Sequence, residues 1–325
     1  MSQKASFIND LTLPAVAAPM FLISGPKLVI ECCKNGIVGT FPALNQRTSE
    51  GFEEWLIEIK TELKKWEEET GKKAAPFGVN LIVHPTNPRL EADVRLCVKH
   101  QVPLVITSLG AVSMVIDAIH SYGGIVFHDV IKKRHAEKAA GAGVDGLILV
   151  AAGAGGHAGT INPMSLVAEI KKFFDKTILL SGCISTGRDI AAAMQMGADL
   201  AYMGTRFINA DESKAPQEYK DMIIAAGASD VTYTASISGV HANFLAASLK
   251  AAGLTEEDLK KDTKIDFGKE LDTEAKAWKT IWSAGQGVTT IENTIPVKEL
   301  VGQLKAEFKT AIQEQSKLLE RFPKD

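Results

Sequence analysis

The stretch LILVAAGAGGHAGT, residues 147–160, joins an apolar run to a segment of small residues around a single histidine. The apolar run, 147–151, has no polar interruption, which is typical of a parallel strand that is buried on both faces. In the segment 151–160 the glycines allow a positive φ or a close approach to the backbone, which indicates a bound ligand with His157 aimed at it. A flexible turn that carries a surface histidine is the alternative.

The run 147–151 is one of eight apolar runs that alternate with stretches of helical periodicity. This alternation predicts a (β/α)8 TIM barrel, although a doubly wound sheet alternates in the same way. Glycine or polar residues follow most of the runs, and this favours the barrel, because all its strands end at one face. The expected strands are 15–19, 37–41, 77–81, 104–108, 125–129, 147–151, 178–182 and 200–204. The expected helices are 25–35, 49–70, 87–100, 111–122, 131–142, 163–175 and 186–197.

The composition is that of an ordinary globular protein, with 325 residues, 46% hydrophobic and 23% charged. A net charge of -3 gives no electrostatic reason to expect nucleic acid or an anionic membrane as a partner. No apolar run is long enough for a transmembrane helix, and the first residues lack the apolar core of a signal peptide. The four cysteines form no CxxC pair, which predicts a reduced, cytoplasmic protein without a metal site.

The alternation stops near residue 210, which divides the chain into three parts. Residues 1–210 are expected to form the barrel. Residues 211–295 have the pattern of helices and loops and are expected to form a smaller helical cap that contacts the substrate. Residues 296–325 are expected to hold a C-terminal helix, 297–320, whose apolar face returns to the barrel.

Two glycine-containing turns follow the last two expected strands, SGCIST (181–186) and MGTRF (203–207). Barrels commonly bind a phosphate group between these two loops, through backbone N–H groups and a helix N-terminus. Gly182 and Gly204 allow a close approach of the backbone to the ligand. Ordinary tight turns are the alternative. Hydroxyl groups are available at Ser185, Thr186 and Thr205.

Two other histidines and one cysteine are candidates for the site. His128 ends the fifth expected strand beside Asp129, and whether it faces the ligand is left open. His241 lies in the expected cap, where it could contact the substrate. Cys183 has no base beside it in the sequence, and we expect a small buried thiol rather than a nucleophile.

Several of these motifs together resemble those of the nitronate monooxygenase family, also called 2-nitropropane dioxygenase-like flavoproteins. The resemblance covers nearly the whole chain, and the combination is specific although each piece alone is not. It implies a (β/α)8 barrel, residues 1–210, that binds FMN, with the FMN phosphate held by the two glycine turns, and a helical second domain. The matching stretches are AAPM (17–20), GVNL (78–81), GVDGLILVAAGAGGHAG (143–159), GADLAYMGTRF (197–207) and WSAGQGV (282–288).

Matched residue by residue, the resemblance assigns the catalytic role to His157, in the AGGH motif. Two positions depart from the family pattern. Gly182-Cys183-Ile184 stands where the family usually has Gly-Gly-Ile, and Val150-Ala151 stands where it often has Gln-Gly. The path of the phosphate turn and one hydrogen bond to the flavin ring are therefore in question. The implied FMN contacts are Met20, Asn80, Gly155, Gly156, Gly182, Gly204 and Thr205, with the backbone of Tyr202 and Met203 nearby.

The activity that the resemblance implies is the oxidation of a nitroalkane or nitronate with O2 to a carbonyl compound and nitrite. His157 would remove the acidic proton next to the nitro group, or would anchor a preformed nitronate. One alternative is an FMN-dependent NAD(P)H:quinone reductase or enoyl-ACP reductase of the same superfamily. Another is a barrel that binds a phosphorylated ligand without redox turnover. A small-molecule substrate and O2 are the expected partners, and the sequence leaves a homodimer open.

Overall fold

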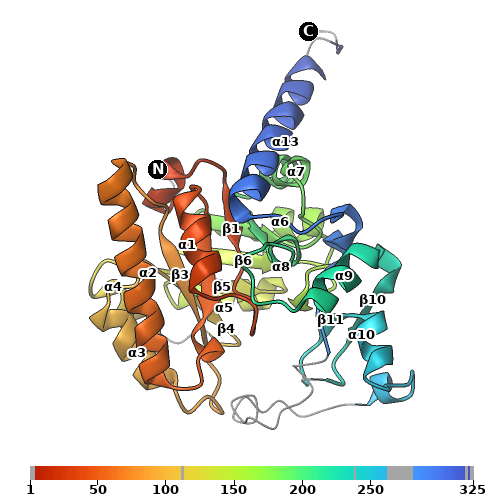
Figure 1. The fold of residues 1–325 in the computed structure, drawn as a ribbon, viewed down its shortest axis with the longest axis horizontal. Helices are drawn as coiled ribbons and strands as arrows, with labels where there is room; N and C mark the ends of the chain where they lie inside the picture. Colours follow the sequence, from red (N-terminus) through yellow and green to blue (C-terminus); the bar gives the residue numbers. More distant parts are fainter. Residues whose placement is uncertain (1–3, 111–112, 238, 262–280, 319–320, 323–325) are drawn as a thin grey trace.

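The computed structural model describes residues 4–110, 113–237, 239–261, 281–318 and 321–322. Eight parallel strands form a closed barrel in which β9 pairs back to β1 (Figure 1). The predicted TIM barrel is therefore confirmed, and each strand lies within two residues of its expected bounds. The barrel strands are β1 (Ala15–Ala17), β2 (Val38–Pro42), β3 (Phe77–Ile82), β4 (Leu104–Ser108), β5 (Ile125–Val130), β6 (Gly146–Val150), β8 (Thr177–Ser181) and β9 (Leu200–Met203).

Helices between the strands cover the outside of the barrel (Figure 1). The periodicity predicts all seven of these helices, although every helix except α2 ends earlier or begins later than expected. They are α1 (Pro26–Lys34), α2 (Ser49–Thr70), α3 (Leu90–Lys99), α4 (Ser113–His120), α5 (Lys133–Gly141), α6 (Pro163–Ile170) and α7 (Gly187–Met196).

Helix α2 shows how the sequence sets such an element. Its apolar side chains recur on one face, where Phe52 and Ile59 are fully buried against the barrel. The N-cap is Thr48, whose side chain accepts a hydrogen bond from the Gly51 N–H. Gly71 ends the helix in the left-handed conformation, with φ 66°, which a glycine adopts without strain.

Successive residues of the strands point to opposite faces of the sheet and fill two separate apolar cores. One core lies inside the barrel and the other lies between the strands and the helices. The inner core closes the barrel beneath the strand ends, so any ligand must bind above it. Inward-facing residues include Val16, Ile106, Phe127, Ile148 and Leu179, and their outward-facing neighbours include Ala17, Val105, Val126, Leu147 and Leu180.

The cap holds strands as well as the expected helices and loops. Strands β10 (Val231–Thr234) and β11 (Ala242–Leu245) pair in antiparallel fashion, and β11 also pairs with the two-residue strand β7 (Gly156–His157). With α9 (Gln217–Ala225) and α10 (Ala246–Ala251), these strands lie together on one side of the barrel (Figure 1). The cap and the loop after β6 are therefore joined by one small sheet.

The chain leaves the barrel and returns to it at a single place. After β9 and the short helix α8 (Thr205–Ile208), Ala210 forms a parallel bridge with Ile295. The Asp211 N–H donates to the Ile295 carbonyl at 3.1 Å. The bridge therefore joins the segment that follows α8 to the segment that precedes Val297.

The C-terminal helix α13 (Val297–Leu318) packs against α7, and its last turns project beyond the barrel (Figure 1). The two backbones approach closely at Gly187, where a Cβ atom would lie 2.1 Å from the Leu304 carbonyl oxygen. The Gly187 N–H donates to Glu307 at 2.6 Å. Helix α13 therefore fixes the first turn of α7.

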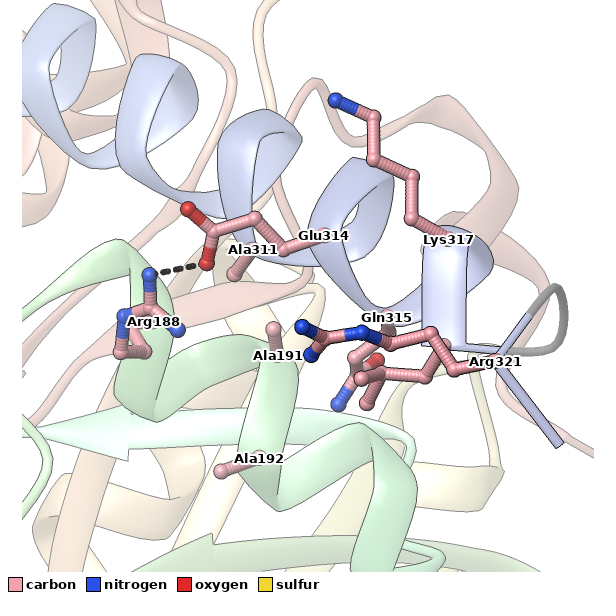
Figure 2. A pocket seen from close by; sticks show the side chains of 9 residues that line it. Arg188, Ala191, Ala192, Ala311, Glu314, Gln315, Lys317 and Arg321 are labelled. Atoms are coloured by element: carbon pink, nitrogen blue, oxygen red, sulfur yellow. Dashed lines mark hydrogen bonds and ion pairs between the residues drawn. The ribbon is translucent and has the colours of Figure 1, made fainter.

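A groove of about 900 Å³ runs between α7 and the projecting end of α13 (Figure 2). Its floor is made of small side chains, Ala191, Ala192 and Ala311, and an exposed ion pair joins Arg188 to Glu314 across it. The groove has no contribution from the strand ends, which is where barrels carry their chemistry. Among the described helices, none has both the length and the hydropathy that a membrane span requires.

Candidate active site

A cavity of about 380 Å³ opens at the C-terminal ends of the barrel strands. This is the face at which barrel enzymes bind their ligands. Seven barrel strands contribute residues to the cavity, among them Pro42 of β2 and Ile82 of β3, and the loop after β1 and the cap form its rim. The other strand residues are Asn80, Ser108, Asp129, Val150, Ser181 and Tyr202.

The cavity brings together eight of the ten residues that the sequence analysis selects. Gly182 and Met203 do not line it. Met203 belongs to the outer core, where it is 1% exposed, so that only its backbone is near the cavity. Gly182 lies one position beyond Ser181, which does line the cavity. The eight residues are Met20, Asn80, Gly155, Gly156, His157, Tyr202, Gly204 and Thr205.

The position of His157 is set by the small sheet. His157 pairs with Ala242 of β11, and the neighbouring Asn243 side chain donates to the Ala154 carbonyl at 2.7 Å. The Nε2 atom of His157 is buried and has no hydrogen-bond partner among the described residues. Burial disfavours the charged imidazolium and lowers the pKa of His157 to about 4. The imidazole is therefore neutral at pH 7 and leaves one ring nitrogen for a ligand.

The glycines before His157 form a contact between two loops as well as part of the cavity. Gly153 and Gly156 adopt positive φ angles of 79° and 66°. A Cβ atom on Gly155 would lie 2.8 Å from the Gly285 nitrogen, and the Gln286 N–H donates to the Gly153 carbonyl at 2.9 Å. The loop 153–156 and the stretch 284–286 therefore pack on each other, which the sequence analysis did not anticipate.

Asp129, rather than His128, faces the cavity. Adjacent residues of a strand point to opposite faces, so only one of the two can point inward. The His128 Nδ1 atom lies 2.8 Å from the Thr107 hydroxyl on the outer side of the sheet, and burial lowers the pKa of His128 to about 4. The sequence leaves open whether His128 faces the ligand, and the structure shows that its side chain points away from the cavity.

The wall formed by β3, β4 and β5 carries a chain of polar side chains. The Asn80 Nδ2 atom donates to the Ser108 hydroxyl at 2.7 Å, and that hydroxyl donates to Asp129 Oδ2. Burial raises the pKa of Asp129 to about 6. Its Oδ1 atom is buried without a hydrogen-bond partner in the described part of the chain. The sequence analysis did not select Ser108 or Asp129 for the site, although their positions at strand ends were a signal.

The rim of the cavity has one lysine and a stacked aromatic pair. Lys214 lies over the Trp55 ring, with its Nζ atom 4.0 Å from the ring centroid, and burial lowers its pKa. The rings of Tyr219 and Trp282 stack at 5.0 Å and are nearly parallel. These residues were not selected from the sequence, because only the tertiary fold brings the cap over the barrel.

The first turn of α7 is not available to a phosphate group. Asp189 accepts hydrogen bonds from the N–H groups of Ser185 and Thr186, at 3.0 and 2.9 Å, and Glu307 accepts one from Gly187. Carboxylates therefore already occupy the positive end of this helix. A phosphate group at the two glycine turns would therefore have to bind without the N–H groups of Ser185, Thr186 and Gly187.

The turns themselves nevertheless suit a phosphate group. Among the described hydrogen bonds, none is donated by the backbone N–H groups of Cys183, Ile184, Gly204 or Thr205. The Ser185 hydroxyl is buried without a partner in the same part of the chain. Free N–H groups in adjacent turns form concave anion sites. These turns therefore fit a phosphate group.

Cys183 differs from its expected state, because it is exposed rather than buried. It adopts a positive φ of 57°, in the left-handed region that favours glycine. This conformation explains why glycine suits this position of the turn. His241 is also exposed. Its ring stacks on Tyr233 at 5.0 Å, and it does not line the cavity.

A TIM barrel whose strand ends surround a half-buried neutral histidine and an unpaired carboxylate oxygen is an enzyme scaffold. Comparison with known proteins gives its class. The chain belongs to the nitronate monooxygenase family, a family of oxidoreductases, and the family model matches residues 4–307. The resemblance inferred from the motifs is thus confirmed.

Individual relatives differ in what they are named for. A nitronate monooxygenase of Paraburkholderia phytofirmans is 32% identical over 190 residues, which cover 53% of this chain and 51% of that protein. The (3aS,4S,5R,7aS)-5-hydroxy-7a-methyl-1-oxo-octahydro-1H-indene-4-carboxyl-CoA dehydrogenase of Rhodococcus jostii is 27% identical over 227 residues, which cover 70% of this chain and 61% of that protein. The chain thus spans less than two thirds of the length of these curated relatives.

Among solved structures, the nitroalkane oxidase of Streptomyces ansochromogenes superposes with a TM-score of 0.81 at 23% identity. The match covers 95% of this chain and 100% of that chain. At this level of identity the likeness concerns the fold alone.

Proposed function

We propose that this chain oxidises alkyl nitronates with O2 to a carbonyl compound and nitrite, with FMN as its cofactor. The observation that carries the proposal is the half-buried, neutral imidazole of His157, whose Nε2 atom is buried without a partner among the described residues. Membership of the nitronate monooxygenase family supports the substrate class. Homologues named for this activity support it further.

The residues that would hold FMN lie in the two glycine turns and in the wall of the cavity. The turns at 182–184 and 204–205 would bind its phosphate through free backbone N–H groups. Met20, Asn80 and Gly155 line the cavity beside these turns and would contact the ring. When bound, FMN accepts electrons from the substrate and transfers them to O2.

The protonation state of His157 favours a nitronate over a neutral nitroalkane. A nitronate is an anion, and an anion beside the imidazole raises the histidine pKa, so that a charged hydrogen bond forms on binding. A neutral nitroalkane must first lose a proton, and an imidazole with a pKa of about 4 is a weak base for that step. His157 therefore acts foremost as an anchor, and as a base only for slow nitroalkane turnover.

The cap would keep water away from this chemistry. The stacked rings of Tyr219 and Trp282 form part of the rim, and the Tyr219 hydroxyl donates to the Ser283 carbonyl, which fixes the ring. Exclusion of water strengthens electrostatic interactions within a site. The hydrogen bond to the anionic substrate is accordingly stronger under the cap than in solvent.

A second candidate function is the dehydrogenation of a carboxyl-CoA ester. It is favoured by the Rhodococcus jostii relative, which is named for such a reaction and aligns with 70% of this chain. Reductases of the same superfamily, which take electrons from NAD(P)H, are the remaining redox alternative. The three candidates differ in which compound reduces the cofactor.

The test is to purify the protein, release its cofactor by heat and identify it by chromatography. The holoprotein is then mixed without oxygen with 1-propyl nitronate, 1-nitropropane, NADH or an acyl-CoA ester in separate cells. Rapid bleaching of the flavin by the nitronate alone is expected. Bleaching by NADH or by the CoA ester instead would replace the proposal with the corresponding alternative. A colourless protein would favour a barrel that binds a phosphorylated ligand without redox turnover.

A further inference from the structure

Asp129 is the single carboxylate among the described residues that line the cavity, and it has no role in the function proposed above. It lies one residue before Val130, the last residue of β5, and points inward. Its two oxygens differ: Oδ2 accepts the Ser108 hydroxyl, whereas Oδ1 is buried and bonds to none of the described residues. A buried oxygen without a partner is costly unless a ligand supplies the missing hydrogen.

The directions of the hydrogen bonds around Asp129 determine whether the wall formed by β3, β4 and β5 offers donors or acceptors to a ligand. The Asn80 Nδ2 atom donates to the Ile106 carbonyl at 3.3 Å and to the Ser108 hydroxyl at 2.7 Å, which uses both of its hydrogens. The Ser108 proton is in turn committed to Asp129. When Asp129 is ionised, the side chains of Asn80, Ser108 and Asp129 therefore offer only hydrogen-bond acceptors to the cavity. The Oδ1 atom of Asp129 needs a donor from the bound ligand.

No positive charge pairs with Asp129 in the described residues. The titratable groups that face the same cavity are His157, which is neutral, Tyr202, Tyr219 and the rim residue Lys214. The charge of Asp129 contributes to raising the pKa of Tyr202, after burial. His128, next to Asp129 in sequence, bonds to Thr107 on the other face of the sheet. A carboxylate in this setting lies close to protonation at neutral pH.

We propose that Asp129 contacts the flavin ring through Oδ1 and takes up a proton from solvent when that flavin is reduced. The inference rests on the proposed FMN cofactor. An oxidised flavin ring is uncharged and offers an N–H donor to the carboxylate. On reduction, two electrons from the reductant and one proton go to the ring, which then carries negative charge. This charge favours the protonated form of Asp129, and a second proton passes from solvent to Oδ1.

Redox-difference infrared spectroscopy of the holoprotein tests this step directly. Dithionite reduces the bound flavin at pH 7.5, and the spectrum is recorded in H2O and in D2O. We expect a C=O stretch of a protonated carboxyl group to appear on reduction, to shift in D2O, and to be absent from Asp129→Asn. Asp145→Asn is the matched control, because Asp145 is half-buried, accepts from the Val126 N–H and does not line the cavity, so the band persists in this variant.

Ser108→Ala provides a second variant with a different expected result. Loss of the hydroxyl donor removes a hydrogen bond that favours the ionised carboxyl, so the Asp129 pKa rises further. The carboxyl band is then already present in the oxidised protein at pH 7.5, and the difference band weakens. If Asp129 only positions the flavin and takes up no proton, the redox-difference spectra of Ser108→Ala and the wild type should be the same.

The outcomes separate this inference from the proposed function. A protein that binds FMN and is reduced, but shows no carboxyl band or shows the same band in Asp129→Asn, overturns the inference about Asp129 and leaves the cofactor intact. A protein that retains no flavin overturns the cofactor assignment on which the inference rests. Proton uptake, measured with a pH indicator, is expected to fall by about one proton per flavin in Asp129→Asn.

Discussion

Gly155 and Gly285 meet backbone to backbone, because a Cβ atom on Gly155 would lie 2.8 Å from the Gly285 nitrogen. In the other direction, a Cβ atom on Gly285 would lie 2.5 Å from the Gly153 carbonyl oxygen. The Gly285 N–H also donates to the Thr205 hydroxyl at 2.9 Å. The loop that carries the histidine, the candidate phosphate turn and the end of the cap therefore converge at one point.

This contact predicts that Gly155→Ala and Gly285→Ala lower flavin retention. Each added methyl group meets backbone atoms rather than a flexible side chain, so a loop must move. Such overpacking typically costs about 1–3 kcal/mol. Flavin content per protein and the thermal midpoint measure the effect. Gly141→Ala is the control, since a Cβ atom there meets nothing within 4 Å, and it should match the wild type.

His157→Asn is expected to fold and bind FMN but to lose most of its slow turnover of neutral nitroalkanes, for which His157 is the base. Loss of a general acid–base group typically costs about 10²–10⁴ in rate. Turnover of a neutral nitroalkane should fall most, and turnover of a preformed nitronate should fall less, because its proton is already gone. Steady-state kinetics with both substrates measure this difference. His241→Asn, at an exposed position outside the cavity, should change neither rate by more than a few-fold; equal rates for wild type and His157→Asn would remove the histidine from the mechanism.

The pKa of Asp129 predicts a pH-dependent stability difference for Asp129→Asn. Burial raises this pKa from 3.8 to about 6, so the folded state binds more protons than the unfolded state between these values. The carboxyl group therefore destabilises the fold as pH rises through this window, by on the order of 3 kcal/mol above pH 6. Flavin-free Asp129→Asn should be more stable than the wild type at pH 7.5, and this difference should shrink toward pH 4. Urea unfolding at several pH values measures it, and a pH-independent difference would contradict the explanation.

The crossing of α7 and α13 predicts that Gly187→Ala is strongly destabilising. Its Cβ atom would lie 2.1 Å from the Leu304 carbonyl oxygen, so α13 would have to move away. We expect a loss of about 1–3 kcal/mol or more in the free energy of unfolding. Arg188→Ala, at the next position, breaks an ion pair whose side chains are 64% and 53% exposed, and should cost less than about 1 kcal/mol. Similar losses in the two variants would show that the close approach does not determine stability.

The positive φ of Cys183 predicts that glycine is favourable at this position. A non-glycine residue in the left-handed region costs about 1–2 kcal/mol, which Cys183→Gly relieves while adding some freedom to the unfolded chain. FMN affinity, measured by fluorescence titration, should stay equal or improve. Cys183→Ala keeps the Cβ atom and should show no improvement. Loss of turnover in Cys183→Ala with flavin still bound would instead identify a reactive thiol.

The barrel could be predicted from sequence because its strands are continuous apolar runs and its helices have clear periodicity. The small sheet could not be predicted, since β7 has two residues and a pattern of period two needs more. The choice between His128 and Asp129 depends on which face of β5 points inward. The alternation of Val126 and Phe127 between the two cores fixes that direction, but only the assembled barrel reveals it.

The site was partly predictable for the same reason. Glycines at strand ends and the AGGH motif point to the ligand, because their chemistry is local. Lys214 and the Tyr219–Trp282 pair reach the cavity from the cap, and no local pattern indicates that they lie over the barrel. The occupation of the α7 N-terminus by Glu307 is likewise a contact between segments 120 positions apart in sequence.

Because β7 pairs with β11, the loop after β6 that carries His157 is part of both the barrel and the cap sheet. By chain connectivity the loop is an extension of the sixth barrel strand, whereas by hydrogen bonding Gly156 and His157 form the edge strand of the cap sheet. A chimaera that exchanges residues 211–295 for those of a homologue would therefore replace the template that orients the imidazole. Recombination among such proteins would preserve the geometry at His157 only where the donor's equivalent of β11 keeps the register of Ala242 and Asn243.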